Sequence, residues 1–252
     1  MLAALLSCSD SVKVSRTLDA MPAIFPDYNG VVIPPNIAPL NFALNDQDAG
    51  SCAVFSFGGQ QFEVKGEKGG FVIPPSKWKK LLESAAGNSI QVTVQVKQGN
   101  EWVAYSPFTI QVAAEKIDSY LAYRLIDPGY ELWNKMGIYQ RDLESYTQAP
   151  IIENKMSGNN CVNCHSFCMQ SPDKMLFHMR ETFPGTILVD GDKIEKLNTK
   201  TKETISSLVY PSWHPSGKYV AFSVNTTKQA FHLNDKNRVE VYDEASDVVV
   251  YH

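Results

Sequence analysis

The sequence predicts an all-β protein, and three patterns indicate that fold class. Residues 90–97 alternate strictly between apolar and polar side chains, which is the period of a strand with one buried face. Short apolar runs separated by Gly, Pro, Asn and Asp recur along most of the 252 residues. Helical spacing of apolar residues is clear only over residues 76–86, with Ser76 as the expected cap and Gly87 at the end.

Residues 30–115 are expected to form a β-sandwich of the immunoglobulin or fibronectin type. A turn at residues 98–100 follows the alternating strand and leads to a return strand over residues 102–105. Several short strands separated by turns are typical of a two-layer sandwich. Charged residues are spread singly here, so we interpret this domain as a spacer or docking module. The other expected strands are residues 40–44, 52–57, 61–64 and 108–112.

The first eight residues resemble the end of a bacterial lipoprotein signal, because a short apolar run is followed by Ser7 and Cys8. The resemblance implies that Cys8 is lipidated and tethers the protein to a bacterial membrane, outside the cytoplasm, in the periplasm or at the outer membrane. No Lys or Arg precedes the run, so we expect the true start to lie upstream. A buried N-terminal helix is the alternative. Residues 9–29 show no sustained period and are expected to be a tether.

The overall composition argues against two classes of partner. The formal net charge is -4 and the isoelectric point is near 5.7, so nucleic acid is not an expected partner. No uninterrupted apolar run approaches the ~20 residues that a membrane-spanning helix needs. Membrane association is therefore expected only through a lipid on Cys8.

Residues 210–223 contain the clearest repeat unit. Trp213 is the expected core anchor, residues 215–218 form a tight turn, and residues 219–224 form the strand that follows. This run resembles the TolB-type β-propeller repeat, although His214 replaces the usual Ser and Ser216 replaces the usual Asp. The resemblance implies that this region is built from propeller blades.

Weaker copies of the repeat precede it. Residues 171–177 line up with residues 214–222 if the earlier copy lacks two residues at the turn. Propellers close with about 4 to 8 blades, whereas residues 116–252 hold only about three. We therefore expect an incomplete TolB-like propeller and a chain that is the N-terminal part of a longer protein. The outer strands of the middle copy are expected at residues 186–190 and 194–197, and those of a fainter copy at 121–125 and 138–143.

Residues 161–168, Cys-Val-Asn-Cys-His-Ser-Phe-Cys, carry the clearest chemical motif. In Cys-x-x-Cys-His, two thiols can add to the vinyl groups of a haem while the imidazole binds its iron. From Tyr120 onward the chain resembles bacterial lipoproteins that join TolB-like blades to such a loop and are often labelled cytochrome c-related. The resemblance implies haem c attached to Cys161 and Cys164, with His165 as axial ligand, in a loop between blades.

Other interpretations of the motif remain open. The thiols could form a redox-active pair, half of a zinc site, or a structural disulfide with Cys168. If haem is bound, a second axial ligand is expected. His178, on the strand of residues 174–180, is the first choice, and Met175 on the same strand or Met169 is the second. His214 and His232 are expected to be a turn residue and a surface residue.

Three function classes follow. The first is a membrane-tethered c-type haem protein of the cell envelope, with an electron-transfer or redox role and the propeller as a platform for partners. The second is a non-catalytic scaffold that binds protein or polysaccharide, with a structural Cys loop. A thiol–disulfide enzyme is the weakest, because no helix is expected to begin at Cys161 and lower its pKa. Without a hydrolase motif, we expect an electron-transfer or binding protein rather than an enzyme.

Overall fold

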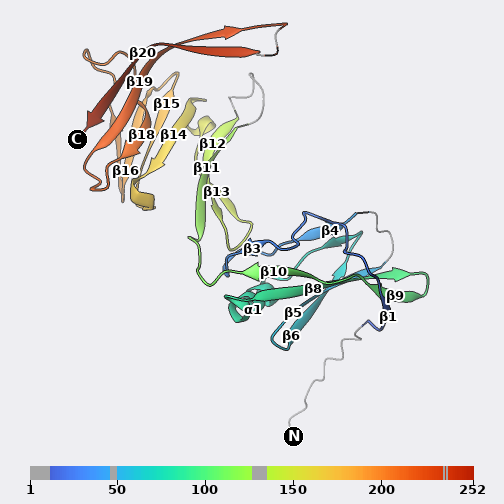
Figure 1. Cartoon of the computed structure of the whole chain (residues 1–252). Helices are drawn as coiled ribbons and strands as arrows, with labels where there is room; N and C mark the ends of the chain where they lie inside the picture. Colours follow the sequence, from blue (N-terminus) through green and yellow to red (C-terminus); the bar gives the residue numbers. More distant parts are fainter. Residues whose placement is uncertain (1–11, 46–49, 127–134, 235, 237) are drawn as a thin grey trace. The chain divides into compact units, whose positions relative to one another are not determined.

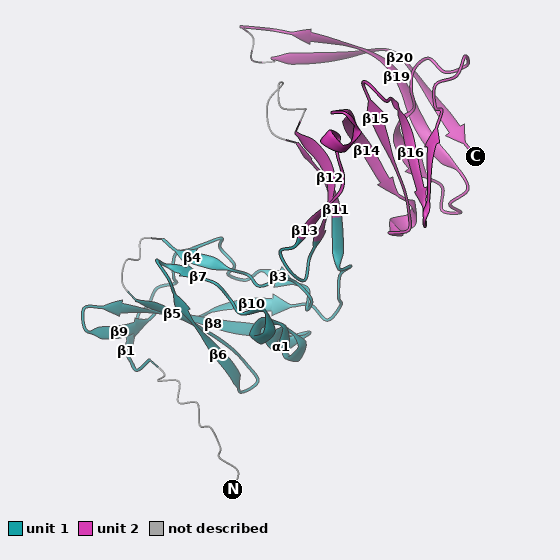
Figure 2. Ribbon diagram, turned by 180° about the vertical axis from the view of Figure 1, so that it is seen from behind, with its two compact units in different colours: residues 1–121, 142–147 teal, residues 122–141, 148–252 magenta. Residues whose placement is uncertain are grey.

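The computed structural model describes residues 12–45, 50–126, 135–234, 236 and 238–252. Over these described residues the chain is all-β, with 54% of them in strands and several sheets, none of which is closed. Two compact units are distinguished in Figure 2. The first contains the described residues up to Leu121 together with Asp142–Thr147, and the second contains Ala122–Arg141 and Gln148–His252. The expected fold class is therefore confirmed at this level.

Strand β8 lies at the centre of the main sheet in the first unit (Figure 1). It pairs antiparallel with β5 along one edge and with β9 and β10 along the other. β1 then pairs parallel with β9, and β3 parallel with β10. A smaller sheet has the order β2-β4-β7. The strands are β1 Val14–Thr17, β2 Ile24–Phe25, β3 Val32–Ile33, β4 Phe42–Leu44, β5 Ser51–Phe57, β6 Gln60–Gly66, β7 Gly70–Phe71, β8 Ser89–Gln98, β9 Glu101–Ala104 and β10 Phe108–Val112.

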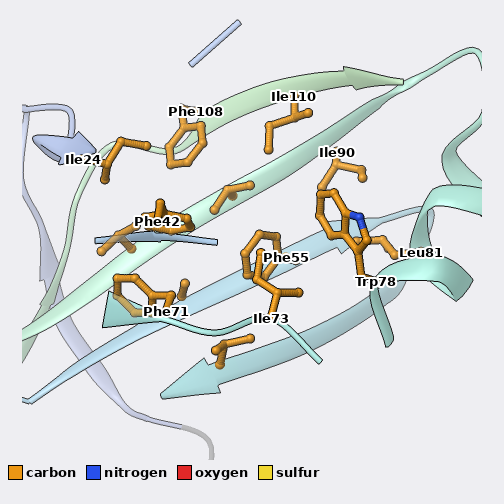
Figure 3. Packing of buried hydrophobic residues seen from close by; sticks show 14 of the residues in the cluster. Ile24, Phe42, Phe55, Phe71, Ile73, Trp78, Leu81, Ile90, Phe108 and Ile110 are labelled. Carbon is orange, nitrogen blue, oxygen red and sulfur yellow. The ribbon is translucent and has the colours of Figure 1, made fainter. Parts of the chain in front are cut away.

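The core of this unit confirms the alternating pattern of residues 90–97. Ile90, Val92, Val94 and Val96 are all 0% exposed, whereas the residues between them are exposed or half-buried. Helix α1, Pro75–Ala85, adds Trp78 to the same core from its buried face. Figure 3 shows Trp78 beside aromatic and aliphatic side chains from several strands. Burial of apolar side chains from both sheets and from the helix therefore stabilises this unit.

Two expectations for this unit are wrong. Ser76 does not cap the helix, because the helix begins at Pro75, and Pro74, which precedes it, makes no side-chain cap. Pro suits the first helical position, where its missing N–H has no partner to lose. The expected tether also contains β1 and β2, which pair with β9 and β4. Strands of two to four residues are too short to show a period.

Among the described residues, the second unit contains three sheets, each made from strands that follow one another in the chain (Figure 1). Most of the expected strands are present, and β13 is an addition. Short 3₁₀ turns, Asn154–Ser157 and Cys168–Gln170, flank β14. The strands are β11 Tyr120–Ile126, β12 Met136–Asp142 and β13 Gln148–Glu153; β14 Cys161–Phe167, β15 Lys174–Arg180, β16 Gly185–Asp190 and β17 Lys193–Leu197; β18 Val209–Trp213, β19 Val220–Phe231 and β20 Val239–Tyr251.

Strand β15 is buried on both faces because the sheet of β14–β17 lies between the other two. Met175, Phe177 and Met179 pack in one apolar cluster with Ile138 of β12. Leu176, on the opposite face, packs in a second cluster with side chains of β19. The expected alternation along residues 174–180 is confirmed.

The pairs β14–β15 and β18–β19 repeat the same structure. In the first, Phe167 pairs with Met175, and in the second Trp213 pairs with Val220. The connection from Phe167 to Met175 is one residue longer than the connection from Trp213 to Val220. The sequence comparison predicted that it would be two residues shorter. Cys168 therefore occupies the place of His214, and the 3₁₀ turn Cys168–Gln170 accommodates the longer connection.

Candidate thiol and imidazole site

The Cys-x-x-Cys-His motif forms strand β14 instead of the expected loop. Asn163 pairs with His178 and Ser166 pairs with Leu176, so three steps along β14 match two steps along β15. The extra residue makes a β-bulge in which Cys164 and His165 both lie opposite Phe177. β-Bulges redirect side chains and are frequent beside functional sites. The motif was mistaken for a loop because its apolar and polar residues do not alternate through the bulge.

Cys164 occupies the left-handed region of backbone conformation, with φ of +52°. This region is sparsely populated by residues other than glycine. Tyr210 has φ of +50° at the corresponding bulge of β18, where Val209 pairs with Ser223 and Ser212 with Ala221. The bulge therefore belongs to the repeat, and the residues placed on it differ between the two copies.

The thiols of the described cysteines are free. Cys161 and Cys164 are half-buried, so reagents can reach them. Cys168 is buried beside Gly217, where an added Cβ would lie 3.2 Å from its Sγ atom. The disulfide with Cys168 that the sequence left open is not formed.

Arg124 and Asn163 connect the neighbouring strand β11 to the first thiol. The Arg124 guanidinium donates to Oδ1 of Asn163, and Nδ2 of Asn163 donates to Sγ of Cys161 at 3.5 Å. This chain directs an N–H donor and a positive charge toward the sulfur. Sequence reasoning missed both residues, because Arg124 lies 39 positions before Asn163.

His165 is the most constrained group of the motif. Its ring packs edge-on against Phe167, with centroids 6.4 Å apart, and hydrogen-bonds the backbone of Ala122. Burial lowers the pKa of the imidazole, the Arg124 charge lowers it further, and the bond to Ala122 partly opposes both effects. The ring is therefore neutral at pH 7, which is the form that binds a metal.

The three expected second ligands lie in different surroundings. His178 is 2% exposed, and its Nδ1 atom lies 3.2 Å from Oγ1 of Thr186 on β16. Met175 is buried in the apolar cluster that includes Ile138. Met169 is largely exposed in the 3₁₀ turn after β14.

The remaining expected groups are also located. His214 lies in a turn, where Gly217 donates to its backbone oxygen, and His232 contacts Glu240 at 3.1 Å. Both positions agree with the turn and surface roles expected for them. Cys8 lies outside the described residues. Within the described ranges no three His, Cys, Asp or Glu side chains are grouped as a metal site, and no helix is long and apolar enough to cross a membrane.

Comparisons by family model, curated sequence and solved structure find no match to this chain. No related protein therefore indicates the chemistry of this site, which has to be inferred from the residues that form it. Two free, half-buried thiols and one neutral imidazole within five consecutive residues fit the donor set of covalently attached haem.

Proposed function

We propose that Cys161, Cys164 and His165 attach a c-type haem, and that the protein has an electron-transfer or redox role at the bacterial cell envelope. The observation that carries the proposal is the bulged strand β14, which holds two free thiols and an imidazole within five residues of one edge strand. When bound, haem would supply reversible one-electron chemistry at its iron.

Cys161 and Cys164 would each hold one vinyl group of the haem. In such an addition the S–H bond and the π bond of the vinyl group would break while a C–S bond and a C–H bond form, so the step needs no oxidant or reductant. Asn163, which accepts a hydrogen bond from Arg124, donates to Sγ of Cys161 and so helps to position this thiol. Neutral His165 can bind the iron through the ring nitrogen that does not contact Ala122.

The architecture is part of the proposal. A second antiparallel sheet, β2-β4-β7, shares one apolar core with the main sheet, and this supports an immunoglobulin-like first unit. Consecutive antiparallel strands, face-to-face packing and a repeated bulge support TolB-like propeller blades in the second. A lipid on Cys8 would tether both units to the membrane, outside the cytoplasm.

A pyridine haemochrome spectrum tests the proposal directly. The full chain is expressed with haem-attachment machinery, denatured and examined for a covalently retained c-type band. We expect the band in the native protein, its loss when both Cys161 and Cys164 are changed to Ser, and its retention in Cys168→Ser.

The axial ligands are tested with the same preparation. We expect His165→Ala to change the visible spectrum of the folded haem protein. His178→Gln should leave that spectrum unchanged, because His178 contacts Thr186 instead. A colourless, folded native protein would overturn the proposal.

One observation favours the binding scaffold as a second candidate. Val248 and Val250 of β20 are 76% and 63% exposed on a strand of thirteen residues. Exposed apolar side chains on a long edge strand are typical of surfaces that bind a partner. Binding of a partner by the haem-free protein would support this function. It would not decide the haem proposal, which the haemochrome spectrum tests separately.

A further inference from the structure

A second site lies at one end of the sheets β14–β17 and β18–β20. Its cavity has a volume of about 450 Å³, within the range of sites for small molecules. The lining comes from the end of β15, the start of β18, and the part of β19 and β20 that extends past the neighbouring sheet. The residues used in the argument are Arg180, Ser207, Tyr210, Asn225, Thr227 and Gln229.

One wall of this cavity is an addition to the repeat. Pairing places Arg180, the last residue of β15, at the position of Asn225 in β19. β19 continues to Phe231, and residues 226–231 have no counterpart in β15. We call these residues and their partners on β20 the arm. Thr227 and Gln229, which line the cavity, both belong to the arm.

The arm begins at an irregularity. Thr226 pairs with Ala245, but Thr227 pairs with Asp243, so β20 contains one extra residue there. A bulge bends and twists a strand pair. The change of direction therefore occurs where the repeat ends and the cavity wall begins.

The lining is rich in neutral groups that can form hydrogen bonds. Within the described part of the chain, the side chains of Arg180, Ser207, Tyr210, Thr227 and Gln229 make no hydrogen bond or ion pair. Asn225 accepts a bond from Ser223 through Oδ1, which leaves its amide N–H groups for another acceptor. These groups can meet a polar ligand without first breaking protein contacts.

The deepest polar group is His178. Its Nδ1 atom faces Thr186, and Oγ1 of Thr186 lies 3.4 Å from Oγ1 of Thr199. Thr186 therefore fixes the orientation of the histidine ring, and the ring also lines the cavity. His178 is therefore a fixed polar group in the cavity wall.

We propose that this cavity binds a neutral saccharide. Amide and guanidinium groups match the paired hydroxyls of a sugar ring, because they can bond two neighbouring oxygens at once. Tyr210 is 65% exposed, and its ring offers a flat apolar surface for the C–H face of a sugar. Arg180 and Glu181 both line the cavity and balance in charge, so a ligand with net charge gains little.

This inference is independent of haem at Cys161, so its test uses the full chain prepared without haem. Binding is measured by titration calorimetry and saturation-transfer NMR with glucose, galactose, mannose, N-acetylglucosamine, cellobiose and chitobiose. We expect at least one of these sugars to bind with a Kd in the range of about micromolar to millimolar.

Matched variants locate the binding. Gln229→Ala and Tyr210→Ala are expected to weaken binding by about tenfold or more. Lys228→Ala should bind like the native protein, because Lys228 lies on the opposite face of the same strand and pairs with Glu244. Circular dichroism checks that each variant is folded.

Three results would overturn the inference. One is no binding of any sugar in the panel at tens of millimolar. Another is equal binding by the native protein and the Gln229→Ala and Tyr210→Ala variants, which would place the sugar elsewhere. The third is binding of glucuronate in place of glucose, which would show a preference for an anion.

Discussion

At Cys164 an unfavourable backbone conformation coincides with the residue that carries the chemistry. The corresponding Tyr210 has nearly the same φ, so the fold of the repeat imposes this conformation. The motif could be predicted from residue identity, because two Cys and one His stand at recognisable spacing. The strained bulge and the contact from Arg124 could not, because they arise from pairing between strands.

Glycine substitution tests the bulge. Cys164→Gly should be more stable than Cys164→Ala by about 1 kcal/mol, because only glycine adopts positive φ without steric cost. Urea unfolding of the haem-free protein measures the difference. At Cys161, where β14 is regular, the order should reverse, with Gly less stable than Ala. The same order at both positions would contradict the bulge.

His178 should make stability depend on pH. Burial, and to a lesser extent the Arg180 charge, lower its pKa to about 4 from the ordinary 6.5. Between these values the unfolded state binds more protons than the folded state, so stability is complete above about pH 6.5 and falls as pH decreases toward 4. The loss should amount to about 3 kcal/mol.

Unfolding in urea at pH 7.5 and 4.5 measures this effect. His178→Gln can still bond Thr186 but does not titrate, so it should lose less stability than the native protein between the two pH values. Equal losses in both proteins would show that His178 does not carry the dependence. Carboxylates titrate in both, so the comparison removes their contribution.

At the scale of elements, the sequence predicts long strands well and short or interrupted ones poorly. β8 shows a clean period because one face is buried and the other is not. β1 and β2 have too few residues to show a period, and Pro150 interrupts the pattern of β13. Helix α1 was found from its apolar spacing, but its start was misplaced because Pro75, and not Ser76, begins it.

Burial on both faces of β15 predicts a large effect of truncation there. Leu176 is 1% exposed between two sheets, so Leu176→Ala should destabilise the protein by about 2 to 5 kcal/mol. Ile194 of β17, in the same sheet, is 71% exposed, and Ile194→Ala should change stability by less than about 0.5 kcal/mol. Urea unfolding compares them. Similar costs at both positions would contradict the stacked arrangement.

At the scale of the whole molecule, the division into units follows contacts that are distant in sequence. Ala38 donates to the backbone oxygen of Leu143, and Asn36 donates to Glu144. These bonds assign Asp142–Thr147 to the first unit, although the segment connects β12 to β13 of the second. A single domain boundary near residue 115, as the sequence predicts, cannot assign this later segment to the first unit.

Each unit has its own apolar core, so damage to one core should lower the stability of that unit first. Trp78 is buried in the first unit and Phe222 in the second. Replacing either by Ala costs about 3 to 5 kcal/mol, enough to lower a melting temperature by about 10 °C or more. Calorimetry should show two transitions in the native chain, with Trp78→Ala lowering one and Phe222→Ala the other. A single transition lowered by both changes would show that the two cores unfold together.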